Sequence, residues 1–277
     1  MSDRSEDGAV SVGAGAAAAA LDRPQPWRGL MWLALRECHR VLRLWTQTTL
    51  APVISSLLFI VVFGLSLGGR ISTIDGFDYE VFIVPGLIAM AMAQAVYSNN
   101  SSTIFQARND RYIDDVLAAP MHSWQMNLGF GVGGVFRAVV IGVALTALAA
   151  PLTGAPIENP LALLLAVALL MAGFGALGIV VGIYAQTFDH ISFVNNIVIL
   201  PLTFLGGVFY SVDRLGSPWE QISHANPLFY VVEAIRYGFL GTSDVSPWIA
   251  FGVIAVIAAA LIAWSQYLFA TGHRLKP

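Results

Sequence analysis

The chain has 277 residues, of which 57% are apolar and only 11% are charged, and its mean hydropathy is +0.71. Because soluble domains carry about a quarter charged residues, this composition excludes an ordinary soluble protein and predicts an all-α integral membrane protein. The net charge of -3 gives no sign of a nucleic-acid partner, and the single cysteine, Cys38, excludes an intramolecular disulfide.

Residues 1–26 are predicted to form a disordered cytoplasmic tail. Their alanine run at 16–20 resembles the apolar part of an export signal, but Asp3, Glu6 and Asp7 stand where a signal peptide is basic. We therefore expect the tail to stay attached to the chain.

Residues 27–47 are predicted to form an amphipathic helix before the first span. Projection at 100° per residue separates an apolar face from a charged one, with Trp32, Leu33 and Leu44 as exceptions. Such a helix either lies in the membrane interface or only orients the first span. The apolar face is Leu30, Met31, Ala34, Leu35, Cys38, Val41, Leu42 and Trp45; the charged face is Arg36, Glu37, His39, Arg40 and Arg43.

Six apolar stretches are long enough to cross a bilayer, which takes about 20 helical residues. They place a six-span domain at 48–272, followed by a cytoplasmic tail at 273–277. The six stretches are 50–67, 81–105, 134–152, 161–184, 191–210 and 248–269.

The segment 107–125, between the second and third spans, combines alternating charges with an apolar stripe. Arg111 is spaced to pair with Asp114 and Asp115, and Pro120 ends the helix. The segment is either a docking helix for a soluble partner or a solvated loop. The residues assigned to docking are Arg108, Asp110, Arg111, Ile113, Asp114, Asp115, Val116 and Leu117.

Within the spans, polar residues form two patches, which either line a substrate entrance or hydrogen-bond neighbouring helices. Arg137 either extends to the cytoplasmic interface or has a buried functional role. In the fourth span, Gly178 and Gly182 have the spacing that permits close helix contact. The candidate path residues are Ser98, Asn99 and Asn100 in the second span and Asn195 and Asn196 in the fifth.

The connection 211–247 is too long for a simple hairpin, and its part 226–241 is apolar but too short and too charged to span. We expect a re-entrant helix that dips into the outer leaflet, with Glu233 and Arg236 paired at i, i+3. The residues assigned to this outer gate are Asn226, Pro227, Tyr230, Glu233 and Arg236.

Arginine and lysine gather at one side of the predicted bundle, which predicts that both termini are cytoplasmic. That side holds Arg28, Arg36, Arg40, Arg43, Arg108, Arg111, Arg274 and Lys276, whereas the other holds Arg70, Arg214 and Arg236.

Four segments together resemble the permease subunits of ABC exporters with the ABC transmembrane type-2 domain. They are FIVPG at 82–86, DDVLAAP at 114–120, TFLGGVFY at 203–210 and the segment 226–241. The resemblance covers 27–275. It implies a pair of permeases, expected here as a homodimer in the cytoplasmic membrane, bound to separate ATPase subunits that hold ATP and Mg. It also implies that 30–45, 108–120 and 226–241 are the connecting, coupling and re-entrant helices.

The chain has no phosphate-binding loop, because its only lysine is Lys276 and no Gly-x-x-x-x-Gly-Lys-Ser/Thr occurs. Catalysis by this chain is therefore not expected, and ATP hydrolysis is assigned to the partner. No cofactor or metal is expected, since no two of the five histidines share a ligand spacing. An ion-driven secondary transporter, whose spans would need a carboxylate relay, and a membrane-embedded enzyme are the alternatives. The substrate, whether drug, lipid or lipid-linked glycan, is left open.

Overall fold

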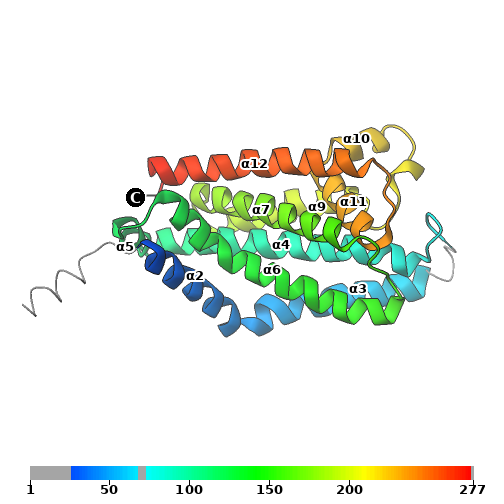
Figure 1. The fold of residues 1–277 in the computed structure, drawn as a ribbon, viewed down its shortest axis with the longest axis horizontal. Helices are drawn as coiled ribbons and strands as arrows, with labels where there is room; N and C mark the ends of the chain where they lie inside the picture. Colours follow the sequence, from blue (N-terminus) through cyan, green and yellow to red (C-terminus); the bar gives the residue numbers. More distant parts are fainter. Residues whose placement is uncertain (1–25, 68–72, 276–277) are drawn as a thin grey trace, which may run out of the picture.

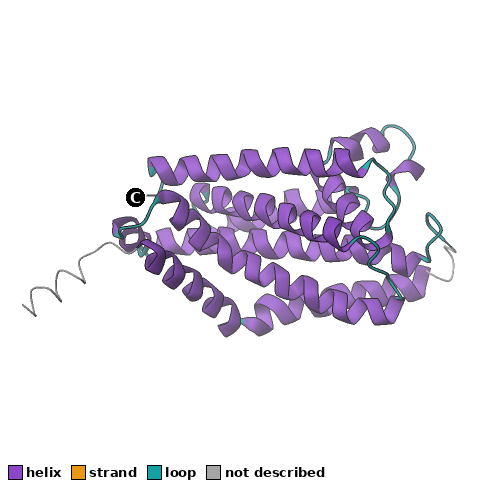
Figure 2. Ribbon diagram, in the orientation of Figure 1, coloured by secondary structure: helices purple, strands orange, loops and turns teal. Residues whose placement is uncertain are grey.

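The computed structural model describes residues 26–67 and 73–275 as a bundle of roughly parallel and antiparallel helices (Figure 1). Helices fill the molecule, and the connecting loops gather at its two ends (Figure 2). The tail predicted for 1–26 lies outside the described residues except for Pro26, as does Lys276.

Six helical segments are long and apolar enough to cross a membrane, which confirms the predicted number and order of spans. The second and third are longer than predicted, at 31 residues each. At 1.5 Å per residue, each is about 46 Å long and exceeds a hydrocarbon core of about 30 Å. The spans are Thr46–Gly64, Tyr79–Asn109, Ser123–Thr153, Pro160–Tyr184, Phe188–Leu205 and Pro247–Thr271.

The second span, α4 (Tyr79–Asn109), is the core of the bundle. It is mostly buried and packs against α6 (Ser123–Thr153), α7 (Pro160–Tyr184) and α11 (Pro227–Leu240). α12 (Pro247–Thr271) covers α7 and α11 on the outside, as Figure 1 shows. Because α4 is largely enclosed, many of its polar residues are buried against other helices.

Glycines permit the close contact between α4 and α7. A Cβ at Gly178 would stand 2.6 Å from the Tyr97 carbonyl oxygen, and one at Gly182 would stand 2.6 Å from the Ser101 carbonyl oxygen. These two glycines therefore serve helix packing, as their spacing predicts.

Two of the spans contain a π-helical turn, the first span at its start and the fifth in its middle. The first is η1 (Thr46–Leu50), between α2 (Pro26–Arg43) and α3 (Ala51–Leu67). The second is η2 (Val194–Ile199), between α8 (Phe188–Phe193) and α9 (Leu200–Leu205). Each ends two residues before a proline, Pro52 or Pro201, which has no N–H for the helix ladder and crowds the carbonyl four residues earlier. Wide turns of this kind are frequent at functional sites.

The segment before the last span contains η3 (Val212–Arg214), α10 (Trp219–Ala225) and α11. Asn226 caps α11 by accepting a hydrogen bond from the Leu228 amide at 2.9 Å, and Pro227 occupies its first turn. Gly241 ends the helix at φ 70°. α10 and α11 lie at one end of the bundle, whereas α5 (Ile113–Ala118) lies at the other (Figure 1).

The Gly182 contact is tested by Gly182→Ala. Its Cβ would collide with the α4 backbone, so we expect a loss of about 1–3 kcal/mol of stability, measured by thermal unfolding in detergent. Gly252→Ala in α12 is the matched control, because no atom lies within 4 Å of a Cβ there. The control should be neutral or stabilising by up to about 1 kcal/mol. Equal melting of the two variants would contradict the close packing of α4 on α7.

Candidate functional site

The helix before the first span, α2, turns part of its charged face toward the bundle. Leu33, Glu37 and Val41 are its buried residues, spaced by four, whereas Met31 and Trp45 of the apolar face are exposed. The projection assigns Glu37 to the charged face, opposite the apolar one, yet Glu37 is buried, because this side of α2 lies against α6 and polar groups of α4. Leu33, an exception to the predicted pattern, lies on the packed side.

Two glycines of α6 let α2 approach closely. A Cβ at Gly129 would stand 2.6 Å from the Leu33 Cδ2, and one at Gly133 would stand 2.8 Å from the Glu37 Cβ. The two glycines are four residues apart, as are Leu33 and Glu37, so one turn of α2 lies against one turn of α6.

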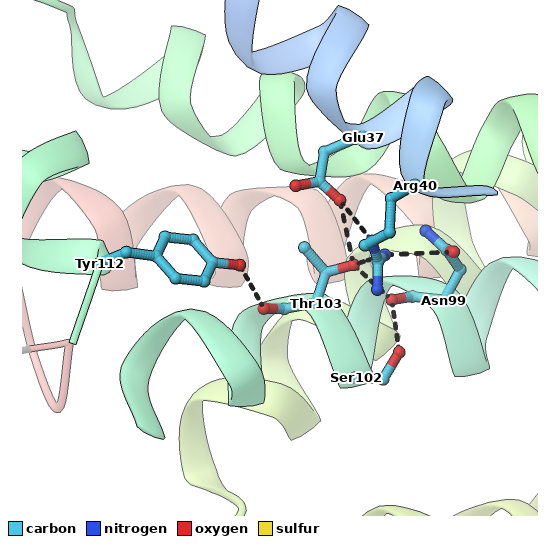
Figure 3. Close-up of polar contacts among 6 residues, drawn as sticks. All are labelled: Glu37, Arg40, Asn99, Ser102, Thr103 and Tyr112. Atoms are coloured by element: carbon cyan, nitrogen blue, oxygen red, sulfur yellow. Dashed lines mark hydrogen bonds and ion pairs between the residues drawn. The ribbon is translucent and has the colours of Figure 1, made fainter. Parts of the chain in front are cut away.

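A polar network joins α2 to α4 (Figure 3). The Arg40 Nε donates to the Glu37 Oε2 at 3.0 Å, and the Thr103 hydroxyl donates to the same oxygen at 3.3 Å. The Arg40 guanidinium also donates to the Asn99 Oδ1 at 3.2 Å and to the Thr103 hydroxyl oxygen. Glu37 is fully buried, so this ion pair is largely removed from water. Breaking a buried pair by removing one partner is costly, which makes the network a strong link between the two helices.

Tyr112 extends this link to the segment after α4. The Arg36 guanidinium lies 3.9 Å from the centre of the Tyr112 ring, and the Tyr112 hydroxyl donates to the Thr103 carbonyl at 3.4 Å. Burial raises the pKa of the Tyr112 hydroxyl above its usual value, so it remains a neutral donor at physiological pH. Tyr112 is thus in contact with α2 and α4 at once.

The docking stripe predicted in 108–120 packs inward. Ile113 of α5 is buried, and Val116 and Leu117 are half-buried against a cluster that includes Leu33 and Phe130. The expectation of an unpartnered apolar surface is therefore wrong, because the bundle itself covers the stripe.

The charged residues of this segment remain at the surface. Asp110, Arg111, Asp114 and Asp115 are exposed, and none belongs to the three ion pairs found among the described residues, so the predicted Arg111 pairs do not form there. Arg108 instead donates to the Gly182 and Ala185 carbonyls at 3.2 and 3.0 Å, which secures the end of α7. The result is an acidic rim, Asp110, Asp114 and Asp115, on a well-packed base.

The five candidate path residues separate into different environments. Ser98 and Asn195 line one cavity between α3, α4, α6 and η2. Asn99 belongs to the α2–α4 network, and Asn100 donates to the Gly175 carbonyl of α7 at 3.1 Å. Asn196 is exposed and accepts from the Asn195 amide at 3.0 Å. The structure thus brings only Ser98 and Asn195 together in one cavity, and Asn100 lines a different one.

At the opposite end, Glu233 and Arg236 form the predicted ion pair, and both are buried. Arg236 also donates to the Gly207 carbonyl at 2.5 Å and lies over the Phe82 ring, 4.0 Å from its centre. Glu233 accepts from the Asp244 amide at 2.6 Å. The pair therefore fastens α11 to the loop before α10, to the loop before α12 and to α4. Of the other residues assigned to this gate, Asn226 is buried, Tyr230 is half-buried and Pro227 is exposed.

The comparisons with known proteins agree with this architecture. The sequence profile of the ABC-2 type transporter family matches residues 28–240. The chain belongs to this family. It is 40% identical over 243 residues to the inner membrane transport permease YadH of Escherichia coli K12, covering 85% of this chain and 95% of YadH. It is 28% identical over 239 residues to nodulation protein J of Rhizobium leguminosarum bv. viciae, covering 83% and 90% of the two chains.

Family membership confirms the predicted function at the level of the subunit. The chain is a membrane permease subunit of an ABC transporter, and the family implies a separate ABC ATPase as its partner. An inner-membrane, multi-pass location follows from the same relatives and from the six apolar helices.

The α2–α4 network is tested through Cys38, the chain's single cysteine. Burial, and then the charge of Glu37, raise the pKa of its thiol, so the thiolate that reacts with maleimide is scarce at neutral pH. Glu37→Gln removes that charge and loosens α2. The labelling rate should therefore rise at pH 7, and its pH profile should move to lower pH. Glu220→Gln, at the other end of the bundle, is the control, and an unchanged profile in Glu37→Gln would contradict the network.

The buried pair of α11 is tested by a double-mutant cycle. Glu233→Gln and Arg236→Gln each leave an uncompensated buried charge, so each should cost about 3–5 kcal/mol of stability, whereas the double change should cost less than their sum. Unfolding in detergent measures the three values. Asp75→Asn, which removes an exposed ion pair with Arg214, should cost no more than about 1 kcal/mol. Additive costs at Glu233 and Arg236 would exclude the pair as a structural unit.

Proposed function

We propose that two copies of this chain form an exporter, with the substrate path between them and with both termini in the cytoplasm. The arginine distribution supports this orientation. Among the described residues, α2 and the segment 108–111 before α5 together hold six arginines, whereas η3 and α11, toward the other end in Figure 1, hold one each. The α5 end is therefore assigned to the cytoplasm, and α2, whose apolar residues are exposed there, is assigned to the membrane interface.

The acidic rim is the proposed docking surface for the ATPase subunit, and it carries the proposal. The rim lies beside Ile113, Val116 and Leu117 of α5, which pack into the bundle. A force that the ATPase applies to the rim therefore moves α5 and the helices packed against it. From α5 the force reaches α2 through Tyr112, and it reaches α7 through Arg108. ATP and Mg are assigned to the ATPase, and this chain is assigned no catalytic role and no cofactor.

The buried segment α11 is the proposed outer gate. Its ion pair, its caps and its packing against α4 fix it at the end of the bundle opposite α5. We assign it a re-entrant position in the outer leaflet, where its polar backbone ends are covered by protein. Movement of α4 reaches this gate through the contact of Phe82 with Arg236.

An ion-driven transporter is the alternative. The described residues contain two fully buried carboxylates, Glu37 and Glu233, outside the predicted spans. Each is paired with an arginine, Arg40 or Arg236, and the two pairs lie in different elements, α2 and α11, so they do not form a chain of carboxylates through the spans. Transport that stops on ATP depletion while the proton gradient persists supports the ATP-driven exporter, and transport that continues supports the alternative.

Docking is tested by reversing charge at the rim. Asp114→Arg with Asp115→Arg should leave folding intact, because both side chains are exposed, but should lower association with the co-expressed ATPase at least about tenfold. Co-purification from membranes measures association. The matched control is Glu158→Arg with Asp213→Arg, two exposed acidic residues at the opposite end. Normal association in the Asp114 and Asp115 variant would exclude the rim as the docking surface.

A further inference from the structure

A furrow of about 370 Å³ lies between the two spans that contain π-helical turns. Its floor is α4, with Gln94 and Ser98, and its α3 wall includes Ser55 and Phe59, which are both exposed. The furrow is therefore open along α3. It is polar at its centre, although it lies within the part of the bundle formed by apolar spans.

Two amides in the furrow have unused hydrogen-bonding atoms. The Gln94 Nε2 and the Asn195 Oδ1 are buried and have no hydrogen-bond partner among the described residues. Both residues line the furrow, one from α4 and the other from η2. Buried polar atoms are costly when unpaired, so these positions favour a ligand that supplies both an acceptor and a donor.

Arg137 of α6 gives the furrow a positive charge. Its Nε donates to the Thr48 carbonyl oxygen at 2.7 Å. In a regular α-helix this oxygen would accept a hydrogen bond from the backbone N–H of residue 52, but Pro52 has no N–H. Arg137 belongs to none of the three ion pairs among the described residues, and no carboxylate lines the furrow. The neighbouring Arg40 is already paired with Glu37. Among the described residues, the furrow therefore has a cation without a counter-charge.

We propose that this furrow binds the headgroup of an anionic amphiphile, with Arg137 contacting a phosphate and Gln94 and Asn195 contacting polar groups beside it. Guanidinium groups bind phosphate through charge-assisted hydrogen bonds. The apolar tail leaves along the open side, past Phe59, an exposed apolar residue of the α3 wall. This proposal rests on the proposed function and names the substrate class for its path: a phosphate carried on a long apolar tail.

Two sources share this chemistry, a diacyl phosphate lipid and a polyprenyl phosphate. Tail-labelled phosphatidic acid and polyprenyl phosphate are titrated separately into the full chain in detergent, with diacylglycerol as the uncharged probe. The wild-type chain should prefer at least one of the phosphates over diacylglycerol. The phosphate that the chain binds more tightly identifies which of the two lipid types supplies the ligand.

Arg137→Gln should reduce that preference about tenfold without changing the affinity for diacylglycerol. Arg137→Lys should retain most of it. The matched control is Arg43→Gln, an exposed arginine of α2 outside the furrow, which should leave the preference unchanged. No preference in the wild-type chain, or equal losses in Arg137→Gln and Arg43→Gln, would overturn the site.

Ser98→Asp separates binding from a purely structural role of Arg137. It places a negative charge in the furrow and keeps both residues of the Arg137–Thr48 hydrogen bond. The preference for phosphate should fall as it does in Arg137→Gln, and an unchanged preference would overturn the proposal. Co-purification of the ATPase with the same variants should stay normal, because the acidic rim is untouched. A failure of ATPase binding in the wild-type chain would instead refute the proposed coupling.

Discussion

The burial of α4 is the constraint on which the rest of the structure depends. This helix is largely enclosed by α6, α7 and α11, so a buried polar residue of α4 is costly unless another part of the protein or a ligand pairs with it. Near the α5 end, Thr103 and Asn99 form hydrogen bonds with residues of α2. Near the other end, the Phe82 ring packs against the Arg236 guanidinium. One continuous helix therefore contacts the proposed coupling network and the proposed gate. A rigid element with packed contacts at both ends is a physical route for energetic coupling between the two ends.

Proline and glycine shape the surfaces around this central helix. Glycines of α6 and α7 allow α2 and α4 to approach at backbone distance. Pro52 and Pro201 follow π-helical turns in the first and fifth spans, and the furrow lies between these turns. Because Pro52 has no N–H, the Thr48 carbonyl is left for Arg137, which holds this charged group at the start of the first span. The irregular turn before Pro52 therefore both positions the Arg137 guanidinium and borders the furrow around it.

The features with a strong local signal could be predicted from the sequence. Apolar runs located the six spans, and the i, i+3 spacing located the ion pair of Glu233 and Arg236. The Gly178 and Gly182 spacing predicted close packing, which the structure shows against α4. Each of these features depends on neighbours in the chain or on the bilayer thickness, which are known without the tertiary structure.

Features that depend on a partner helix were missed. Projection of α2 separated apolar from charged residues correctly, but it did not show that Glu37 meets Arg40 and Thr103 inside the protein. The sequence does contain a signal for this contact. Leu33, Glu37 and Val41 are four residues apart on α2, and the two glycines of α6 that Leu33 and Glu37 approach are also four residues apart. Likewise, the apolar stripe of α5 was assigned to an outside partner because the bundle end that covers it comes from distant segments.

The central claim is that the α5 end of this permease contacts its ATPase subunit. Site-specific cross-linking tests it most directly, with Cys38→Ser as background and Asp115→Cys as the single reactive position. A maleimide cross-linker in membranes should join this position to the co-expressed ATPase, and the yield should change with nucleotide. A cysteine at Asp213 should give no such product. Cross-linking at Asp213 in place of Asp115 would contradict both the docking surface and the orientation of the bundle.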